Sequence, residues 1–251
     1  ILAVTNQKGG VGKTTTAVNL SACLAALGQR VLMIDLDPQG NATTGCGVVK
    51  REALPTVYQI LIGRSTLVDA RIKTEFGFDI LPANRELAGA EVELIEMGGR
   101  EFRLRDALAP VLGDYDFILM DCPPALNMLT VNGLVAAEAV MIPMQCEYYA
   151  LEGLTDLVAT LKKVRANLNS RLEIEGLLRT LFDPRSTLTQ QVSNELESHF
   201  GNKVYQTIIP RNVRLAEAPS YGKPVIAFDR NSKGAQSYSA LAREILERTA
   251  A

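Results

Sequence analysis

A glycine-rich segment near the beginning of the sequence carries the residue types that bind phosphate groups. Residues 8–15 read Lys8-Gly9-Gly10-Val11-Gly12-Lys13-Thr14-Thr15. Glycines allow backbone N–H groups to approach phosphate oxygens without a Cβ atom in the way. In such loops the lysine, here Lys13, reaches the β- and γ-phosphates, and the following hydroxyl, here Thr14, ligates Mg²⁺. The pattern predicts a nucleotide-binding loop, although the strict pattern has glycine where this chain has Gln7.

Two apolar runs end in aspartates. Residues 30–35 end at Asp35, with Asp37 two positions later, and residues 117–121 end at Asp121. In an open parallel sheet, side chains at the carboxyl ends of the strands face the ligand crevice. These carboxylates are therefore candidate functional groups beside the bound phosphates. Asp35 and Asp37 also fit a simple strand-to-loop turn, because Pro38 and Gly40 follow them.

The segments around these residues alternate between strand and helix patterns. Residues 1–6 are a short apolar run, residues 14–27 have helical apolar spacing, and residues 30–35 are a continuous run typical of a strand buried on both faces. Together they form a strand–helix–strand unit. Further predicted strands are 78–82, 117–121, 139–143, 174–181 and 204–209, and further predicted helices are 87–95, 102–111, 130–137, 151–167, 188–200 and 236–248.

This alternation predicts an α/β fold, a doubly wound and mostly parallel sheet with helices on both faces. Neither an internal repeat nor a low-complexity tract or linker interrupts the sequence. We therefore expect a single domain over residues 1–251.

The composition excludes several classes of protein. Of the 251 residues, 47% are apolar and 22% are charged, which is too apolar for a disordered chain. No run approaches the roughly 18 apolar residues of a membrane span. The single histidine, His199, excludes a multi-histidine metal site, and a Ser-His-Asp triad would have to use it.

The four cysteines are widely spaced and include no Cys-x-x-Cys pair. We interpret Cys23, Cys46, Cys122 and Cys146 as small buried apolar side chains rather than disulfides or metal ligands. Cys122 also reads as packing, since nothing basic near it in sequence would lower its pKa. No secretion signal precedes the first predicted strand, so we expect a cytoplasmic protein, and Ile1 in place of Met suggests a few further residues upstream.

Charge is distributed unevenly along the chain. The formal net charge is −2, but residues 201–251 hold eight basic and four acidic side chains, a balance of +4. The first 200 residues therefore sum to −6. A basic cluster of this kind binds phosphates without reading base sequence, although it also fits an ordinary solvated surface.

The loop at residues 8–15 resembles the deviant Walker A loop of the ParA/MinD family of ATPases. The resemblance implies ATP/ADP and Mg²⁺ as cofactors, and it makes Lys8 the family's extra signature lysine. In that family the lysine reaches across an ATP-dependent sandwich homodimer to the partner's phosphates. It then neutralises charge on the transferring phosphoryl group only after dimerisation, as an arginine finger in trans does.

The aspartates also fit the family pattern. Asp37 resembles the switch I aspartate, which positions or activates the attacking water, and Asp35 is assigned to an outer position near the magnesium. Residues 117–124, which end Asp121-Cys122-Pro123-Pro124, resemble the Walker B and switch II segment. That resemblance implies that Asp121 holds Mg²⁺, usually through water, because Mg²⁺ gives up its waters reluctantly.

Residues 209–224 (IPRNVRLAEAPSYGKP) resemble a stretch of the chromosomal ParA subgroup, often called Soj. In that subgroup the stretch borders the adenine pocket, which makes Pro210 and Asn212 candidate contacts to the base. Arg211 matches an arginine implicated in DNA binding. The candidate DNA-binding residues are Arg211, Arg214, Lys223, Arg230 and Lys233. We expect no sequence-specific readout, since no helix-turn-helix or zinc finger accompanies them.

The resemblance implies an ATP-hydrolysing partition ATPase of chromosomes or plasmids. It would bind non-specific double-stranded DNA as a homodimer, associate with the nucleoid and release on stimulation by a ParB-like activator. A MinD-like membrane-associated cell-division ATPase is the alternative. We expect no membrane partner, because the predicted C-terminal helix carries Glu244 and Glu247 and would bind anionic lipid poorly.

Overall fold

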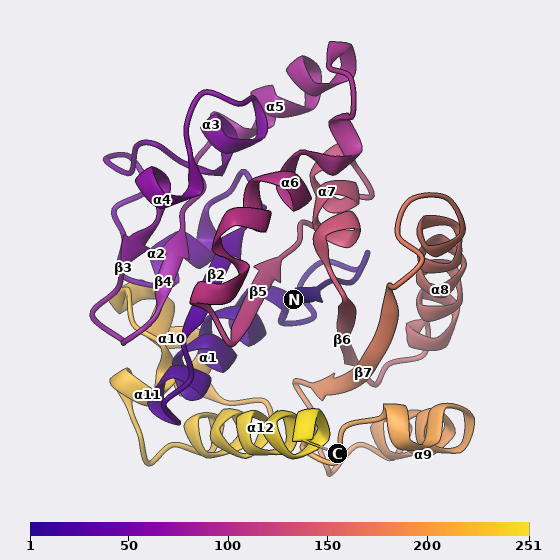
Figure 1. The fold of residues 1–251 in the computed structure, drawn as a ribbon. Coiled ribbons are helices and arrows are strands. Elements are labelled where there is room, and N and C mark those ends of the chain that lie inside the picture. The colour runs from indigo at the N-terminus through magenta and orange to yellow at the C-terminus, as the bar shows by residue number, and fades with distance from the viewer. Residues whose placement is uncertain (251) are drawn as a thin grey trace.

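Seven strands form one twisted sheet in the order β3-β4-β2-β5-β1-β6-β7 in the computed structural model, which describes residues 1–250 (Figure 1). The strands are β1 (Leu2–Val4), β2 (Val31–Asp35), β3 (Ile72–Lys73), β4 (Asp79–Leu81), β5 (Phe117–Asp121), β6 (Ala139–Gln145) and β7 (Glu173–Thr180). Neighbouring strands are parallel except β3, which pairs antiparallel with β4 at one edge. The predicted mostly parallel α/β sheet is confirmed.

Two layers of helices cover the sheet and bury its two faces in separate apolar clusters. One face carries α1 (Lys13–Ala26), α2 (Asn41–Gly45), α10 (Val213–Glu217), α11 (Val225–Phe228) and α12 (Lys233–Ala250). The other carries α3 (Val57–Leu61), α4 (Leu67–Ala70), α5 (Leu87–Glu93), α6 (Arg103–Leu108), α7 (Met128–Ala136), α8 (Ala150–Asn167) and α9 (Thr187–Phe200). Figure 1 shows α12 and α1 below the sheet and α6 and α7 on its opposite side.

Short 3₁₀ turns extend several of these helices. They span Leu94–Glu96, Arg100–Phe102, Ala109–Asp114, Gly201–Lys203 and Ala218–Tyr221. Among residues 1–250 no helix combines the length and mean hydropathy that a membrane crossing requires.

The long elements lie close to their predicted ranges because their apolar spacing is strong. The segment 41–73 was predicted to hold no element, yet it contains α2, α3, α4 and β3. Each of these is at most five residues long, so none spans enough turns or alternations to establish a period. This segment also contains Thr43, which lies in α2, in the stretch that follows Asp37.

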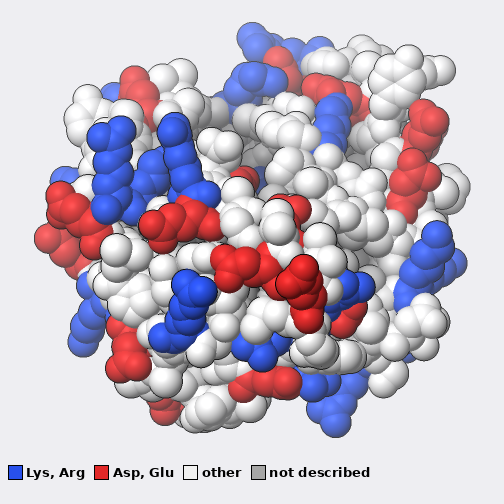
Figure 2. All heavy atoms as spheres, turned by 90° about the horizontal axis from the view of Figure 1, so that it is seen from above, with Lys and Arg blue, Asp and Glu red and all other residues white. Residues whose placement is uncertain are grey.

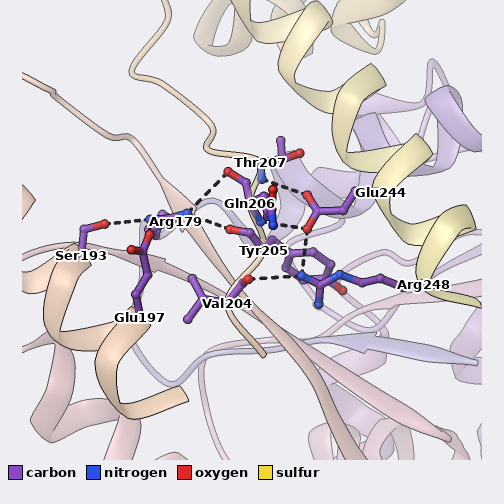
Figure 3. Close-up of polar contacts among 9 residues, drawn as sticks. All are labelled: Arg179, Ser193, Glu197, Val204, Tyr205, Gln206, Thr207, Glu244 and Arg248. Atoms are coloured by element: carbon purple, nitrogen blue, oxygen red, sulfur yellow. Dashed lines mark hydrogen bonds and ion pairs between the residues drawn. The ribbon is translucent and has the colours of Figure 1, made fainter. Parts of the chain in front are cut away.

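The strand predicted at 204–209 is wrong. These residues run beside β7 as extended chain without a continuous ladder. Isolated bridges at Leu177–Val204 and Phe182–Pro210 join the two segments, and the N–H of Ile209 donates to the carbonyl oxygen of Arg179 at 2.9 Å. Side chains replace the missing ladder (Figure 3). Arg179 of β7 donates to the carbonyl oxygen of Tyr205 at 2.8 Å, and Glu244 of α12 accepts the N–H groups of Gln206 and Thr207 at 2.8 and 2.9 Å.

The sheet brings the predicted acidic strand ends together. Asp121 at the end of β5 lies in register with Val4 of β1 on one side and with Asp35 of β2 on the other. Because the phosphate loop begins directly after β1, the loop and both aspartates share the carboxyl edge of the sheet. This edge is where ligands bind in doubly wound folds.

Candidate functional site

The phosphate loop connects β1 to α1 with a backbone that only glycine adopts readily. Gly10 and Gly12 have φ angles of 75° and 87°, in the left-handed region. Among the described residues no side chain caps the first turn of α1, so its N–H groups stay available to a ligand. A Cβ at Gly9 or Gly10 would meet no atom within 4 Å, and the loop is therefore open on the side where phosphates approach. This is the geometry of an anion cradle at a helix N-terminus.

Lys13 begins α1 and is almost completely buried. Its Nζ donates to the carbonyl oxygen of Lys8 at 2.9 Å, which folds the side chain back over the loop. Burial lowers the pKa of Lys13, and the negative charge of Asp121 partly opposes that shift. A phosphate group in the loop would supply the negative charge that the buried ammonium lacks.

Asp121 carries the most informative observation in the site. Both of its carboxylate oxygens are buried, and neither has a hydrogen-bond partner among residues 1–250. Burial, reinforced by the nearby charge of Asp35, raises the pKa of Asp121 well above its usual range, while Thr14 and Lys13 act in the opposite direction. A buried carboxylate without a partner is costly unless it is paired or binds a metal. The residues here fit an Mg²⁺ ion held between Asp121 and Thr14.

Asp35 and Asp37 have different surroundings. Asp35 is fully buried and accepts hydrogen bonds from Thr43 N at 2.8 Å, Thr43 Oγ1 at 2.7 Å and Asp37 N at 3.1 Å. Burial raises its pKa to about 6. Asp37 lines the cleft beside the loop, and its Oδ1 accepts the N–H of Gln39 at 2.9 Å. Asp35 therefore positions the backbone that carries Asp37, and its carboxylate is directed to Thr43.

Thr43 extends this network to the next strand. Its hydroxyl donates to Asp35 and also accepts the backbone N–H of Ala83, just after β4, at 2.9 Å. Gly40 lies so close to the same segment that a Cβ would be 2.7 Å from the carbonyl oxygen of Ala83. The loop that carries Asp37 is thus fixed at both β2 and β4. Thr43 was not predicted from the sequence, since nothing in the local pattern connects it to Asp35.

The loop, Asp37 and the C-terminal signature surround one cleft of about 410 Å³. At one end the cleft is polar, with Lys13, Thr14 and Asp37. At the other end it is formed by residues from β7 and from the C-terminal part of the chain, which were not predicted as site residues. These are Thr180, Leu181, Ile209, Leu215, Ala216 and Tyr238.

The two candidate base contacts lie at this less polar end. Asn212 lines the cleft, where its side chain also caps α10 by accepting the N–H of Leu215 at 3.3 Å. Pro210 forms a bridge with Phe182 beside the cleft and is not among the lining residues. The proximity of both residues to the cleft agrees with the resemblance, and their contact with a base stays a prediction.

Lys8 is not among the residues that line the cleft of its own chain. Its Nζ forms an ion pair with Glu147 Oε2 at 2.7 Å, and both side chains are about half exposed. Glu147 belongs to the loop between β6 and α8, next to the exposed Tyr148 and Tyr149. Lys8 is therefore held at the surface beside the phosphate loop. Glu147 was not predicted from the sequence, because 139 positions separate the two residues.

The five predicted DNA-binding residues all lie on the surface. Arg214 forms ion pairs with Glu217 at 2.8 Å and with Asp229 at 3.2 Å. Within the described part of the chain, ion pairs are absent from the other four. Figure 2 shows the face seen from above Figure 1, where blue and red side chains are interspersed. Among the described residues, Arg211, Lys223, Arg230 and Lys233 thus offer charge that no ion pair engages.

The cysteine and histidine interpretations are consistent with the structure. All four cysteines are free and buried, and burial raises the pKa of the Cys122 thiol far above its usual value. His199 lies on α9 and contacts the carbonyl oxygen of Glu195 on the same helix. Neither residue type takes part in the cleft.

Comparisons with known proteins identify relatives over nearly the whole chain. A family model described as an AAA domain matches residues 1–174. The chromosome partitioning protein ParA of Caulobacter vibrioides is 53% identical over 251 residues, covering 99% of this chain and 94% of that protein. The chromosome-partitioning ATPase Soj of Thermus thermophilus is 52% identical over 247 residues, covering 98% of this chain and 95% of that protein.

Solved structures share the fold at lower identity. A Mycobacterium smegmatis protein described as cobyrinic acid a,c-diamide synthase, with bound ADP and magnesium, superimposes with a TM-score of 0.87 at 38% identity, covering 100% of this chain and 95% of that one. The septum site-determining protein MinD of Pyrococcus horikoshii, complexed with Mg-ADP, gives 0.81 at 27% identity, covering 97% and 94%. The partitioning proteins are thus much more similar to this chain in sequence than MinD is.

Proposed function

Because this chain belongs to the ParA (Soj) family of chromosome-partitioning ATPases, we propose that it binds Mg-ATP in the cleft described above and hydrolyses it as a DNA-bound homodimer. The observation that supports this most strongly is the pair of buried, unpartnered oxygens of Asp121 beside the phosphate loop. Solved relatives of the same fold hold ADP and magnesium. Asp121 and Thr14 would hold the magnesium ion, which would supply positive charge that neutralises the phosphates.

The other residues have separate roles in this proposal. Residues 9–15 surround the phosphates with backbone N–H groups, and Lys13 contacts the β- and γ-phosphate oxygens. Asp37 orients the attacking water and accepts its proton. Pro210 and Asn212 border the base. Lys8, which is at the surface in one chain, stabilises the transferring phosphoryl group of the partner subunit.

DNA binding would use the exposed basic residues of the C-terminal segment. Arg211, Lys223, Arg230 and Lys233 contact backbone phosphates, so affinity is independent of base sequence and falls with salt. A homodimer doubles this surface and therefore couples DNA binding to ATP. Release follows when a ParB-like partner accelerates hydrolysis, and the cycle places the protein on the nucleoid in its ATP state.

The packing of α12 supports DNA over a lipid surface as the target. Leu241, Ala242 and Ile245 of α12 are buried in the core, and Glu244 is committed to the backbone of residues 206 and 207. An interfacial membrane helix needs an apolar face that is free to enter the bilayer. The apolar residues of α12 are already covered by α1 and the sheet.

Asp37→Ala tests the proposed chemistry directly. The variant should bind ATP and accumulate as a dimer, while phosphate release falls about 100-fold or more because the water loses its orienting carboxylate. Light scattering measures the dimer, and a phosphate-release assay measures turnover. Asp106→Ala, which removes an exposed carboxylate of α6, should behave as wild type. Unchanged hydrolysis in Asp37→Ala would remove Asp37 from the mechanism.

A further inference from the structure

An exposed apolar patch lies beside the loop that follows β5. Three of its residues belong to the α5 segment, which is α5 together with the 3₁₀ turn Leu94–Glu96, and three belong to that loop. They are Ala88, Val92, Ile95, Pro124, Ala125 and Leu126, and all are exposed. The exposed fractions of Val92, Ile95 and Leu126 are 70%, 61% and 49%. Large apolar side chains at this level of exposure, gathered in one place, mark an interaction surface more often than isolated ones do.

Helix geometry explains why the patch is one surface. Leu87, Ala90 and Leu94 form the buried face of the α5 segment. Ala88, Val92 and Ile95 are spaced three or four positions apart and therefore lie together on one flank of that face. Glu91, on the same flank, accepts a hydrogen bond from Asn127 Nδ2 at 2.5 Å. This bond joins the flank to the loop that carries Leu126.

The same loop reaches the nucleotide cleft. Pro124 lines the cleft, and the loop starts at Cys122, directly after Asp121. Asn127 closes the loop by capping α7, where it accepts the N–H of Thr130 at 3.1 Å. A molecule that covers the patch would therefore contact the segment between the proposed magnesium ligand and the start of α7.

The charge around the patch indicates which kind of molecule can bind there. Residues 86–101 contain five glutamates and one arginine, a net charge of −4. Glu96 is exposed, and so is Glu93, which forms an ion pair with Arg64 at 3.8 Å. DNA is repelled by this field. A second copy docking through the same patch would bring two such segments together, because a two-fold interface pairs each surface with itself.

We propose that this patch docks the activating partner through a basic protein segment bearing apolar side chains. The inference rests on the proposed function, since it locates the partner that stimulates hydrolysis. Apolar side chains of the segment cover Val92, Ile95 and Leu126, and its cations face the surrounding glutamates. Docking moves or orders the loop at residues 122–127, and through Pro124 and Asp121 it acts on the nucleotide.

Site-specific crosslinking tests the contact. A benzoylphenylalanine is introduced at position 95 of the full chain, and the protein is illuminated with ATP, DNA and the ParB-type protein of the same genome. We expect a crosslink to the ParB-type protein. The same group at the exposed Val68 on α4 is the control and should give none. The proposal would be overturned if position 95 crosslinked only to a second copy of this chain. It would also be overturned if position 95 gave no more crosslinks to the ParB-type protein than position 68 does.

Stimulated ATPase activity tests the consequence. Val92→Glu should raise the partner concentration for half-maximal stimulation about tenfold or more, with basal hydrolysis and ATP-dependent DNA binding unchanged. Val68→Glu should match wild type, and Glu96→Lys should weaken stimulation most at low salt. Equal stimulation of wild type and Val92→Glu overturns the patch alone. A wild-type protein that the partner does not stimulate overturns the proposed function and this inference with it.

Discussion

Lys13 and Asp121 are both buried beside the phosphate loop, and their pKa values move in the directions that disfavour charge. Burial lowers the pKa of the lysine and raises that of the aspartate. Mg-ATP would bring both a cation and an anion to these two residues. The nucleotide would therefore offset the cost of burying each charge, and its binding should stabilise the fold.

Arg211 should contribute more to DNA binding than Arg214, because Arg214 already pairs with two carboxylates. We expect Arg211→Glu to lose measurable binding at 150 mM salt while it keeps ATP-dependent dimerisation. Arg171→Glu, an exposed arginine outside the basic cluster, is the matched control. Fluorescence anisotropy with a labelled duplex gives the affinities. Normal, salt-sensitive binding by Arg211→Glu would refute the assignment.

At this scale the sequence predicted the residues of contiguous motifs and missed those brought in by folding. Short contiguous motifs made it possible to predict from the sequence that four residues belong near the cleft. These are Lys13, Thr14, Asp37 and Asp121. Thr43, Glu147 and Tyr238 lie in segments whose own pattern indicates only a helix or a loop. Their place in the site depends on long-range packing, and periodicity carries no information about it.

The switch I loop is an element whose shape depends on one hydroxyl. Thr43→Val should leave nucleotide affinity unchanged and lower turnover about tenfold or more, because Asp35 and the N–H of Ala83 both lose a partner and Asp37 loses its fixed position. Thr43→Ser retains the hydroxyl and should recover most of the activity. Steady-state kinetics separates kcat from KM. Full activity in Thr43→Val would show that the network is not needed to position Asp37.

Glu244 holds the backbone of residues 206 and 207, in the segment that was predicted to be a strand. Burial raises its pKa, but hydrogen bonds from Thr207 and Gln206 outweigh burial and leave the pKa lowered. A carboxylate with a lowered folded-state pKa stabilises the fold above its unfolded pKa and loses that effect as pH falls. Glu244→Gln should therefore lower the free energy of unfolding by about 1–2 kcal/mol at pH 7.

The pH dependence distinguishes this role from simple packing. The difference between wild type and Glu244→Gln should shrink as pH falls below the usual glutamate value of 4.5. Urea unfolding at several pH values measures it, with Glu247→Gln on the same helix as control. A difference that stays constant from pH 7 to pH 3.5 would contradict the carboxylate's role.

Whether a predicted strand forms depends on what pairs with its backbone, as residues 204–209 show. Residues 204–209 (VYQTII) are rich in the β-branched and aromatic residues that favour strands. Side chains from β7 and α12 nevertheless satisfy part of the backbone that a neighbouring strand would otherwise pair. Long apolar runs such as β2 and β6 were found because they are buried on both faces. The order of strands in the sheet was not predicted, since it depends on the crossover connections.

For the whole molecule, the exposed position of Lys8 leads to a prediction about pairs of chains. Lys8→Ala and Asp37→Ala should each be nearly inactive alone. In an equimolar mixture, half of the dimers hold one site with both Asp37 and the partner's Lys8, so about a quarter of wild-type activity should return. Phosphate release from the mixture measures this. A mixture as inactive as its components would place Lys8 at the site of its own chain.

The near-neutral total charge of −2 combines an acidic first part of the chain with a basic C-terminal segment of +4. One molecule thus has two surfaces of opposite charge, which attract partners of opposite sign. The acidic surface lies around α5, and the basic surface lies around α10. In this account one surface meets the activating protein and the other meets DNA. Nucleotide controls both, because dimerisation doubles the DNA surface and the loop after β5 reaches the cleft.

Binding to DNA and to anionic liposomes, measured with ADP and with a slowly hydrolysed ATP analogue over a series of salt concentrations, tests the central claim most directly. We expect tight DNA binding only with the ATP analogue, loss of that binding as salt rises, and no liposome binding in either state. Liposome binding that depends on ATP, or DNA binding equal in ADP and the analogue, would contradict it.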